Sequence, residues 1–309
     1  MLKSKNKVIV ISMGDPEGIG PEVTAKAIKR LSPTFNGRIV IVGSRRVMLK
    51  WLKRIPAFVS IIDVPYKNTG EGSLKFLDAA IELVKQGVAD GIVTAPLSKE
   101  RVAVYKSGFK GHTEYLAKSF DVEHVDMMFV ANTMRTVIVT RHEPINMLSK
   151  LITTKKVVES IKLTHQSLVN IFKIKNPKIA ILGLNPHAGE NGLMGMEEVK
   201  AINPAIKQVT KLGWHVKGPF PADTFFAKYF LLRGKADVIS FDAIIAMYHD
   251  QGLIPMKTLY FKDVVNMTIG LPVVRTCPAH GTAFDIAGKN IADPSSMIAS
   301  IKLAFQLVQ

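Results

Sequence analysis

The chain has 309 residues, of which 47% are hydrophobic and 7% aromatic, and its formal net charge is +16. The length predicts about two domains, the composition argues against disorder, and the apolar runs stop well short of the roughly 18 residues that a membrane span needs. The Lys and Arg residues are scattered, without a run of five, a zinc-finger spacing or an RNA-recognition motif, so the charge indicates a Lys-rich surface and not a nucleic-acid site.

Two features bear on the cellular compartment. The chain has one cysteine, Cys277, which excludes an intrachain disulfide. The first apolar run, residues 8–11, is too short for the hydrophobic region of a signal peptide, and Asp15 and Glu17 follow it closely. Both features favour a protein of the reducing cytoplasm.

The first hundred residues alternate between short apolar runs and amphipathic segments. The predicted strands are 8–12, 38–42, 59–63 and 91–95, and the predicted helices are 21–31, 45–53 and 74–86, the last after a Gly-rich loop at 69–73. Alternation of this kind predicts an α/β fold with a mostly parallel sheet and right-handed crossovers.

Each of three later apolar runs ends within a few residues of a histidine. The runs and their histidines are 136–140 with His142, 179–184 with His187, and 243–247 with His249. Ligands bind beyond the carboxyl ends of parallel strands, so three imidazoles at that edge form a natural divalent-metal site. A single histidine of this kind is more often structural, but convergence from three strands favours a metal ion. Nitrogen ligands suit zinc or cobalt, and oxygens from a substrate would admit magnesium or manganese.

The remaining elements suggest how the chain divides. Further helices are predicted at 153–172, at about 199–212 and, after a loop that opens the final segment, at 295–307. Boundaries fall near Asp126 and Ile269. We therefore expect residues 1–126 with 269–309 to form a first α/β domain, and residues 127–268 to form a central α/β domain that carries the histidine strands.

Two loops in the first part of the chain are candidate binding sites. The loop 14–21, Gly-Asp-Pro-Glu-Gly-Ile-Gly-Pro, either lets the backbone approach a ligand or merely connects a strand to a helix; its spacing is neither the dinucleotide fingerprint nor a P-loop. His112 and Thr113 precede the predicted helical stretch 115–119. Free N–H groups at a helix start form a seat for an anion, unless Thr113 serves only as the helix cap.

Polar residues that follow His249 suggest a charged small molecule. Lys257, Asn266 and Arg275 fit a substrate with phosphate and carboxylate groups, which Arg can bind through two hydrogen bonds; the alternative is ordinary surface charge. The segment 280–288 combines Gly and Ala with His, Thr and Asp, which is compatible with a loop on which a flat ligand lies.

Five motifs resemble, in the same order, the 4-hydroxythreonine-4-phosphate dehydrogenase family of vitamin B6 biosynthesis. They are Gly14-Asp15-Pro16 through Pro21, Gly111-His112-Thr113-Glu114, Asn185-Pro186-His187-Ala188-Gly189-Glu190, Pro221-Ala222-Asp223-Thr224 and Met247-Tyr248-His249-Asp250-Gln251-Gly252. The resemblance covers nearly the whole chain. It implies the fold of isocitrate and isopropylmalate dehydrogenases: two α/β/α domains, a cleft between them, and a homodimer whose active site is shared between subunits, with the interface on the central domain.

Carried over by motif, the resemblance assigns residues to four roles. His142, His187 and His249 would be the metal ligands, the third coming from the partner subunit. Substrate would be bound by His112, Thr113, Lys257, Asn266 and Arg275, and the cofactor NAD by His280, Gly281, Thr282, Asp285, Ile286 and Asn290. Asp223 is the candidate general base.

Two positions of the cofactor loop carry further implications. Relatives that use NAD have Asp-Ile where relatives that use NADP have Lys-Tyr, and this chain has Asp285-Ile286. A carboxylate there can accept hydrogen bonds from a ribose hydroxyl and would repel a 2′-phosphate. Ala279 departs from the family, which commonly places Asp before the loop histidine, and this bears on the orientation of His280 and on cofactor affinity.

The expected reaction is NAD-dependent oxidation of 4-phosphohydroxy-L-threonine at its C3 hydroxyl, with a divalent metal ion, followed by loss of CO2. The nearest alternative is a paralogous dehydrogenase of D-threonate or D-erythronate 4-phosphate. Two alternatives come from other classes: a three-histidine hydrolase or aldolase without a nucleotide, and a non-catalytic protein that binds a phosphorylated ligand.

Overall fold

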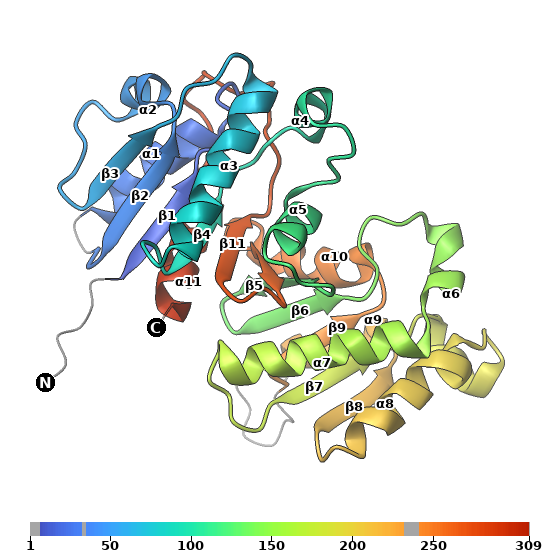
Figure 1. Ribbon diagram of the computed structural model, residues 1–309. Helices are drawn as coiled ribbons and strands as arrows, with labels where there is room; N and C mark the ends of the chain where they lie inside the picture. The colour runs from blue at the N-terminus through green and yellow to red at the C-terminus, as the bar shows by residue number, and fades with distance from the viewer. Residues whose placement is uncertain (1–6, 33–34, 232–240, 309) are drawn as a thin grey trace, which may run out of the picture. The chain divides into compact units, whose positions relative to one another are not determined.

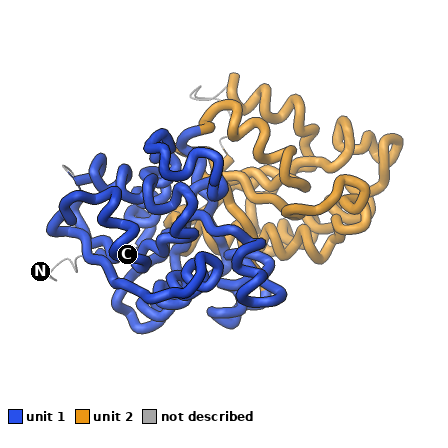
Figure 2. Tube along the Cα trace, turned by 90° about the horizontal axis from the view of Figure 1, so that it is seen from above, with its two compact units in different colours: residues 1–123, 262–309 blue, residues 124–261 orange. Residues whose placement is uncertain are grey.

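The computed structural model of the chain describes residues 7–32, 35–231 and 241–308. Contacts within the chain divide it into two compact units (Figure 2): Met1–Glu123 with Lys262–Gln309 form unit 1, and His124–Phe261 form unit 2. The sequence places the second boundary near Ile269. The structure assigns residues 262–269 to unit 1, because residues 265–269 form a strand that pairs with the strand at 274–278.

Unit 1 is a sheet with helices on both faces (Figure 1). Its strands, in spatial order, are β3 (Val59–Asp63), β2 (Arg38–Gly43), β1 (Val8–Ser12), β4 (Gly91–Thr94), β11 (Val274–Pro278) and β10 (Val265–Ile269). All neighbouring pairs are parallel except β10 and β11. Its helices are α1 (Gly20–Leu31), α2 (Arg45–Trp51), α3 (Thr69–Lys85), α4 (Lys99–Tyr105), α5 (His112–Ser119) and α11 (Ser295–Leu307). α3 covers one face, and α1 and α11 pack together on the other.

The strands of unit 2 are also flanked by helices (Figure 1). Its strands, in spatial order, are β5 (Asp126–Ala131), β6 (Met134–Ile138), β9 (Ala243–Ala246), β7 (Lys178–Leu182) and β8 (His215–Phe220). Its longer helices are α7 (Thr154–Asn170), α8 (Asn203–Thr210), α9 (Ala222–Leu231) and α10 (His249–Tyr260), and the short α6 (Leu148–Leu151) precedes α7. α7 and α8 cover one face and α10 the other. The three histidine strands β6, β9 and β7 are parallel neighbours, which confirms that part of the strand prediction.

The Gly-rich stretch 69–73 is the first turn of α3, so the prediction of a loop there was wrong. The side chain of Asn68 accepts a hydrogen bond from Glu71 N and caps the helix. The glycines serve close packing: a Cβ on Gly70 would lie 2.1 Å from the carbonyl oxygen of Arg101. Glycine near a helix start therefore marked contact with a neighbouring element and not a break in the helix.

Other elements also differ from the prediction. β5 and β6 form an antiparallel hairpin around Asn132, whose φ is +53°. The final segment, predicted to open as a loop, contains β11. The predicted helix at 199–212 begins as a π-helical turn, Glu198–Ile202, and continues as α8.

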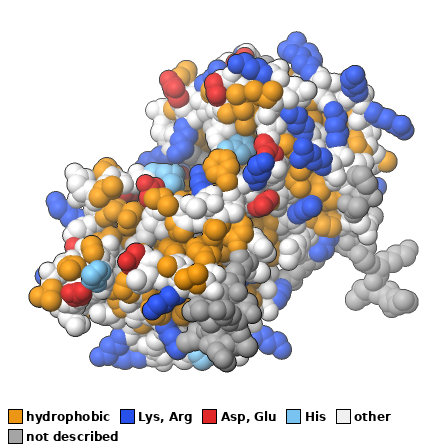
Figure 3. Space-filling model, turned by 180° about the vertical axis from the view of Figure 1, so that it is seen from behind, with side chains coloured by type: hydrophobic (Ala, Val, Ile, Leu, Met, Phe, Trp, Pro, Cys, Tyr) orange, Lys and Arg blue, Asp and Glu red, His pale blue; other side chains and the backbone are white. Residues whose placement is uncertain are grey.

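The basic residues are scattered over the surface, as their distribution in the sequence predicts. On the face shown in Figure 3, Lys and Arg side chains lie among apolar and acidic side chains and are spread over the molecule. Among the described helices, none has both the length and the apolar character that crossing a membrane requires.

Candidate functional site

In unit 2, the carboxyl ends of three parallel strands are tied together by polar groups. Thr140, just beyond β6, donates from its hydroxyl to the carbonyl of Met247 at 2.7 Å. Gln251 accepts from Met247 N at 2.7 Å and donates to the carbonyl of Gly183, just beyond β7, also at 2.7 Å. Gln251 thus joins the segments that carry His187 and His249. Gln251 belongs to the motif 247–252, whose sequence gives no sign of this role.

His142 and His249 approach each other at these strand ends. Their ring centroids lie 5.7 Å apart. His249 Nδ1 lies 2.7 Å from Asp250 Oδ1, so the carboxylate orients the ring and leaves Nε2 for a ligand. This is the arrangement in which metal-binding imidazoles are usually held.

His187 lies on a loop of unusual backbone conformation, Pro186–Gly192, which we name the His187 loop. Five successive φ angles are positive: His187 (52°), Ala188 (53°), Gly189 (76°), Glu190 (40°) and Asn191 (57°). The left-handed region costs a non-Gly residue about 1 kcal/mol or more, and such strain is concentrated at functional sites. His187 Nδ1 lies 2.6 Å from Glu190 Oε1, and this hydrogen bond raises the pKa of His187.

The three histidines do not form a three-donor group within one chain. Among residues 7–32, 35–231 and 241–308, no three His, Cys, Asp or Glu side chains lie close enough together to hold a metal ion. The donors nevertheless fit one chemically, because carboxylates hold Nδ1 of His187 and of His249 and leave Nε2 of each exposed to a ligand. The three-histidine centre remains a prediction, one that a second chain would have to complete.

A pocket of about 590 Å³ opens beside the His187 loop within unit 2. Its polar lining includes His187, Asp223, Tyr248, Asp250 and Gln251. Asp223 lies in the first turn of α9, and its charge contributes to the raised pKa of His187. The structure therefore brings the candidate base close to one candidate metal ligand.

In unit 1, Arg275 is buried without a carboxylate partner among the described residues. It lies on β11 and is 1% exposed. Its guanidinium donates to the hydroxyls of Thr268 at 2.9 Å and of Thr94 at 2.6 Å, and its Nε atom has no partner among the described residues. A buried cation held only by neutral hydroxyls is a strong binding site for an anion.

His112 is the first residue of α5, next to this cation. Gly111 precedes the helix with a φ of +142°, and no side chain caps it, so Thr113 does not act as the cap. The His112 Nε2 atom is buried, again without a described partner. Burial, and then the charges of Arg275 and Lys99, hold the pKa of His112 well below its ordinary value. A neutral imidazole and two cations thus lie where the sequence predicts an anion seat.

Other predicted substrate residues are more dispersed. Thr113 is 3% exposed on α5, and Asn266 lies on β10 opposite Cys277 of β11. Lys257 lies on α10, in unit 2. Lys99 was missed by the sequence analysis, although it lies close after the turn that follows β4, a position where ligand-binding side chains are common.

The predicted cofactor loop is held against the first loop and α1 of unit 1. Ile19 N donates to the carbonyl of Thr282 at 3.0 Å. Lys26 Nζ donates to the carbonyls of Asn290 at 2.9 Å and of Ala292 at 3.0 Å. Asp285 is exposed, as a ribose-binding carboxylate has to be.

The start of the cofactor loop shows how the chain accommodates Ala279. The N–H group of Ala279 donates to Ser296 Oγ at 3.1 Å, which ties this position to α11. His280 Nδ1 lies 3.0 Å from the carbonyl oxygen of Gly281. The backbone here is therefore fixed without the Asp that the family commonly has.

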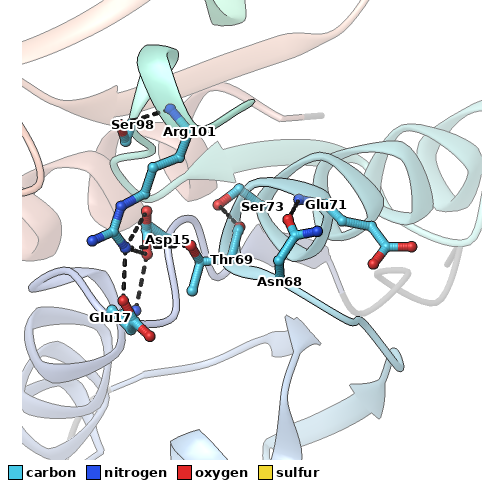
Figure 4. A network of polar contacts seen from close by, with 8 residues as sticks. All are labelled: Asp15, Glu17, Asn68, Thr69, Glu71, Ser73, Ser98 and Arg101. Carbon is cyan, nitrogen blue, oxygen red and sulfur yellow. Dashed lines mark hydrogen bonds and ion pairs between the residues drawn. The ribbon is translucent and has the colours of Figure 1, made fainter. Parts of the chain in front are cut away.

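Arg101 of α4 connects the first loop to the cofactor loop, and no sequence motif marked it. Figure 4 shows its guanidinium pointing toward Asp15 and Glu17. Nη1 lies 2.8 Å from Glu17 Oε2, 3.3 Å from Thr69 Oγ1 and 3.4 Å from Asp15 Oδ1. The guanidinium also lies 4.2 Å from the ring centroid of Phe284, in the cofactor loop. Burial raises the pKa of Asp15, against the opposing effects of the Glu17 N–H group and Arg101.

Comparisons with known proteins give a consistent result. The profile of the family described as "Pyridoxal phosphate biosynthetic protein PdxA" matches residues 21–304. The 4-hydroxythreonine-4-phosphate dehydrogenase of Sulfurihydrogenibium sp. (strain YO3AOP1) is 37% identical over 324 residues, covering 97% of this chain and 98% of the relative. The putative D-threonate 4-phosphate dehydrogenase of Oceanobacillus iheyensis is 37% identical over 337 residues and 98% of each chain. The crystal structure of a 4-hydroxythreonine-4-phosphate dehydrogenase from Klebsiella pneumoniae has a TM-score of 0.87 at 32% identity and covers 100% of both chains.

Proposed function

The chain belongs to the family of the pyridoxal phosphate biosynthetic protein PdxA and is an oxidoreductase of that family, and from this premise we propose that it oxidises 4-phosphohydroxy-L-threonine with NAD and a divalent metal ion. In this reaction the C3 carbon gives a hydride to NAD+, the C3 hydroxyl gives its proton to a base, and 2-amino-3-oxo-4-phosphooxybutanoate forms. That β-keto acid then loses CO2 to give 3-amino-2-oxopropyl phosphate.

The observation that carries this proposal is the buried Arg275 guanidinium, held only by threonine hydroxyls. Together with His112 and Lys99 it forms a cationic seat in unit 1, in which the Arg275 guanidinium has no carboxylate counterion among the described residues. A phosphate or carboxylate group of the substrate supplies that counterion. Thr113, Asn266 and Lys257 complete recognition in the proposal.

His142, His187 and His249 are the proposed metal ligands, with one of them supplied by the partner subunit of a homodimer. A divalent ion held there, zinc by ligand type or else magnesium or cobalt, would stabilise negative charge on the C3 oxygen. Asp250 and Glu190 hold the rings of His249 and His187 through Nδ1. Asp223, in the pocket beside His187, is the proposed proton acceptor.

The cofactor loop supplies the nucleotide site in this proposal. NAD accepts the hydride, and the exposed Asp285 carboxylate bonds to its ribose hydroxyls. His280, Gly281, Thr282, Ile286 and Asn290 form the backbone and side-chain surface on which the adenosine lies. The proposed place of action is the cytoplasm, which a chain with one cysteine fits.

A dehydrogenase of D-threonate or D-erythronate 4-phosphate is the second candidate. The relative from Oceanobacillus iheyensis, whose name gives D-threonate 4-phosphate, matches this chain at 37% identity, as does the first relative. The two substrate classes share the phosphate and the oxidised hydroxyl and differ at the amine. Only turnover of each compound separates them.

The decisive test follows NADH absorbance with purified protein and each phosphorylated substrate. NAD or NADP and zinc, magnesium, cobalt or EDTA are varied in turn. We expect turnover of 4-phosphohydroxy-L-threonine with NAD, loss of turnover with EDTA, and release of CO2. His249→Ala should retain its fold by circular dichroism and lose more than about a hundredfold in turnover. Undiminished turnover in this variant would refute the metal centre, and turnover of D-threonate 4-phosphate alone would favour the second candidate.

A further inference from the structure

Beneath the His187 loop lies a buried carboxylate that the proposed reaction does not use. We propose that Glu198 is a positioning residue that holds the left-handed His187 loop and so presents His187 to the metal ion. The inference rests on the metal centre of the proposed function. It adds a residue that touches neither metal nor substrate.

Glu198 binds the chain immediately before the His187 loop. It is 2% exposed. Its Oε1 atom accepts from Leu184 N at 2.7 Å and from Asn185 N at 2.8 Å, and its Oε2 atom accepts from Asn185 Nδ2 at 2.8 Å. No Lys or Arg of the described residues forms an ion pair with it. The charge of Glu198 is therefore stabilised by N–H groups of the segment that leads into the loop.

Glycines at two points of this segment leave room for the carboxylate. A Cβ on Gly189, inside the left-handed turn, would lie 2.6 Å from Glu198 Oε2. A Cβ on Gly183, where the chain leaves β7, would lie 3.1 Å from Oε1. The same carboxylate thus packs against the chain before the loop and against its strained centre.

The helix that carries Glu198 has a matching irregularity. Glu198 is the first residue of a π-helical turn, and such turns are frequent at functional sites. Pro204 has no N–H group for the carbonyl of Lys200, and the hydroxyl of Thr154 donates to that carbonyl at 3.3 Å instead. Pro204 and Thr154 thus favour the irregular turn from which the Glu198 side chain reaches the segment before the loop.

The backbone of the His187 loop needs such an anchor. Four of its five successive left-handed residues are not glycine, and a conformation of this kind persists only when its surroundings hold it. Without the carboxylate, the N–H groups of Leu184 and Asn185 lose their acceptor. The loop then relaxes and His187 leaves its position.

The test measures cobalt affinity of the metal-free protein by visible absorbance, in the wild type and in Glu198→Gln. Gln keeps the size of the side chain but places an NH2 group against N–H donors. We expect cobalt affinity to fall by about 10- to 100-fold, as for other residues that orient metal ligands, with kcat retained at saturating cobalt. Limited proteolysis should cut the His187 loop faster in the metal-free variant.

Two further variants make the result specific. Glu197→Gln removes the same charge one residue away, where the carboxylate accepts from the side chains of Asn185 and Ser149, and it should change cobalt affinity less than about threefold. Gly189→Ala adds one methyl group against Glu198 Oε2 at a φ of +76°, so it disturbs both the contact and the loop backbone and should weaken cobalt binding even if Glu198→Gln fails to fold.

The possible outcomes distinguish the proposed metal centre from the proposed role of Glu198. Absence of cobalt binding by the wild type would overturn the metal centre, and the inference with it. Cobalt binding by the wild type with unchanged affinity in Glu198→Gln and Gly189→Ala would overturn the inference alone. An equal loss in Glu197→Gln would show that the effect is not specific to Glu198 and would also overturn the inference.

Discussion

At the residue scale, unit 1 contains positive charge that is buried from solvent. Arg275 is 1% exposed, and its guanidinium reaches two threonine hydroxyls. Taking a cation out of water costs several kcal/mol unless an anion compensates. Burial and the nearby cations lower the pKa of His112, which favours the neutral form of its imidazole. The site is thus less stable empty than it would be with an anionic group of substrate bound.

The lowered pKa of His112 predicts a pH dependence of stability. Between that lowered pKa and the ordinary value of about 6.5, the unfolded chain binds a proton that the folded chain does not, so the free energy of unfolding falls as pH falls. From this group we expect a loss approaching about 1.4 kcal/mol per pH unit below pH 6.5. The free energy of unfolding of the His112→Gln variant should fall less over the same pH range.

Urea unfolding at about pH 7.5 and about pH 5.5 measures this difference. Of the two Trp residues in the chain, Trp51 lies on α2 of unit 1, so a Trp214→Phe background makes fluorescence report that unit. Parallel pH profiles for the wild type and His112→Gln would contradict the expectation. Inorganic phosphate should reduce the pH dependence if it occupies the cationic seat.

At the element scale, the strands formed by apolar β-branched runs were predictable, whereas β5, β8, β10, β11 and the special backbone were not. β1 and β3 have the predicted bounds, because short runs rich in β-branched residues favour a strand over a helix. The hairpin at Asn132 had a local signal, a short turn with a residue that tolerates positive φ, that the periodicity analysis passed over. The His187 loop had none. Its left-handed backbone depends on Glu198, which contacts Leu184 and Asn185 across 14 and 13 positions of the chain, a separation that no helix or strand periodicity shows.

The same limit applies to Arg101, whose role comes from contacts between elements. It stacks on Phe284 of the cofactor loop and pairs with Glu17 and Asp15 of the first loop. A half-exposed stack and ion pair together contribute about 1 kcal/mol, so Arg101→Gln should weaken NAD binding by about fivefold. The KM for NAD should rise while kcat at saturating NAD stays close to that of the wild type.

Calorimetric titration with NAD measures this effect directly. Arg101→Lys keeps the charge but loses the planar stack, and it should recover only part of the affinity. Arg46→Gln on α2 controls for the loss of one positive charge at the surface of unit 1. If Arg101→Gln binds NAD as the wild type does, Arg101 does not order the cofactor loop.

At the scale of the whole molecule, the two units divide the proposed chemistry between them. Unit 1 contains the cationic seat and the predicted cofactor loop, and unit 2 contains the three histidines and Asp223. The order of elements in the sequence leads to the same expectation, because strand ends and loops can be assigned to segments of the chain. How donors combine into a site could not be predicted in the same way, since periodicity gives no distances between side chains.

The distribution of the histidines leads to a prediction about assembly. Within the described part of one chain, His142 and His249 approach each other, but no three-donor group forms. A three-histidine centre therefore needs His187 and His249 from different subunits. His187→Ala and His249→Ala should each be inactive alone, because every site in either homodimer lacks one ligand.

Mixing these two variants after dissociation should restore activity. Random reassociation makes half of the dimers mixed, and each mixed dimer has one intact site and one that lacks both histidines, so about a quarter of wild-type turnover is expected. Cobalt absorbance should recover in the same proportion. His142→Ala is also mixed with His187→Ala and, separately, with His249→Ala. The mixture that stays inactive shows which two ligands one subunit supplies together. If the first mixture stays inactive although a mass tag on one variant shows, by native mass spectrometry, that mixed dimers have formed, each site draws all its ligands from one chain, and the shared site is wrong.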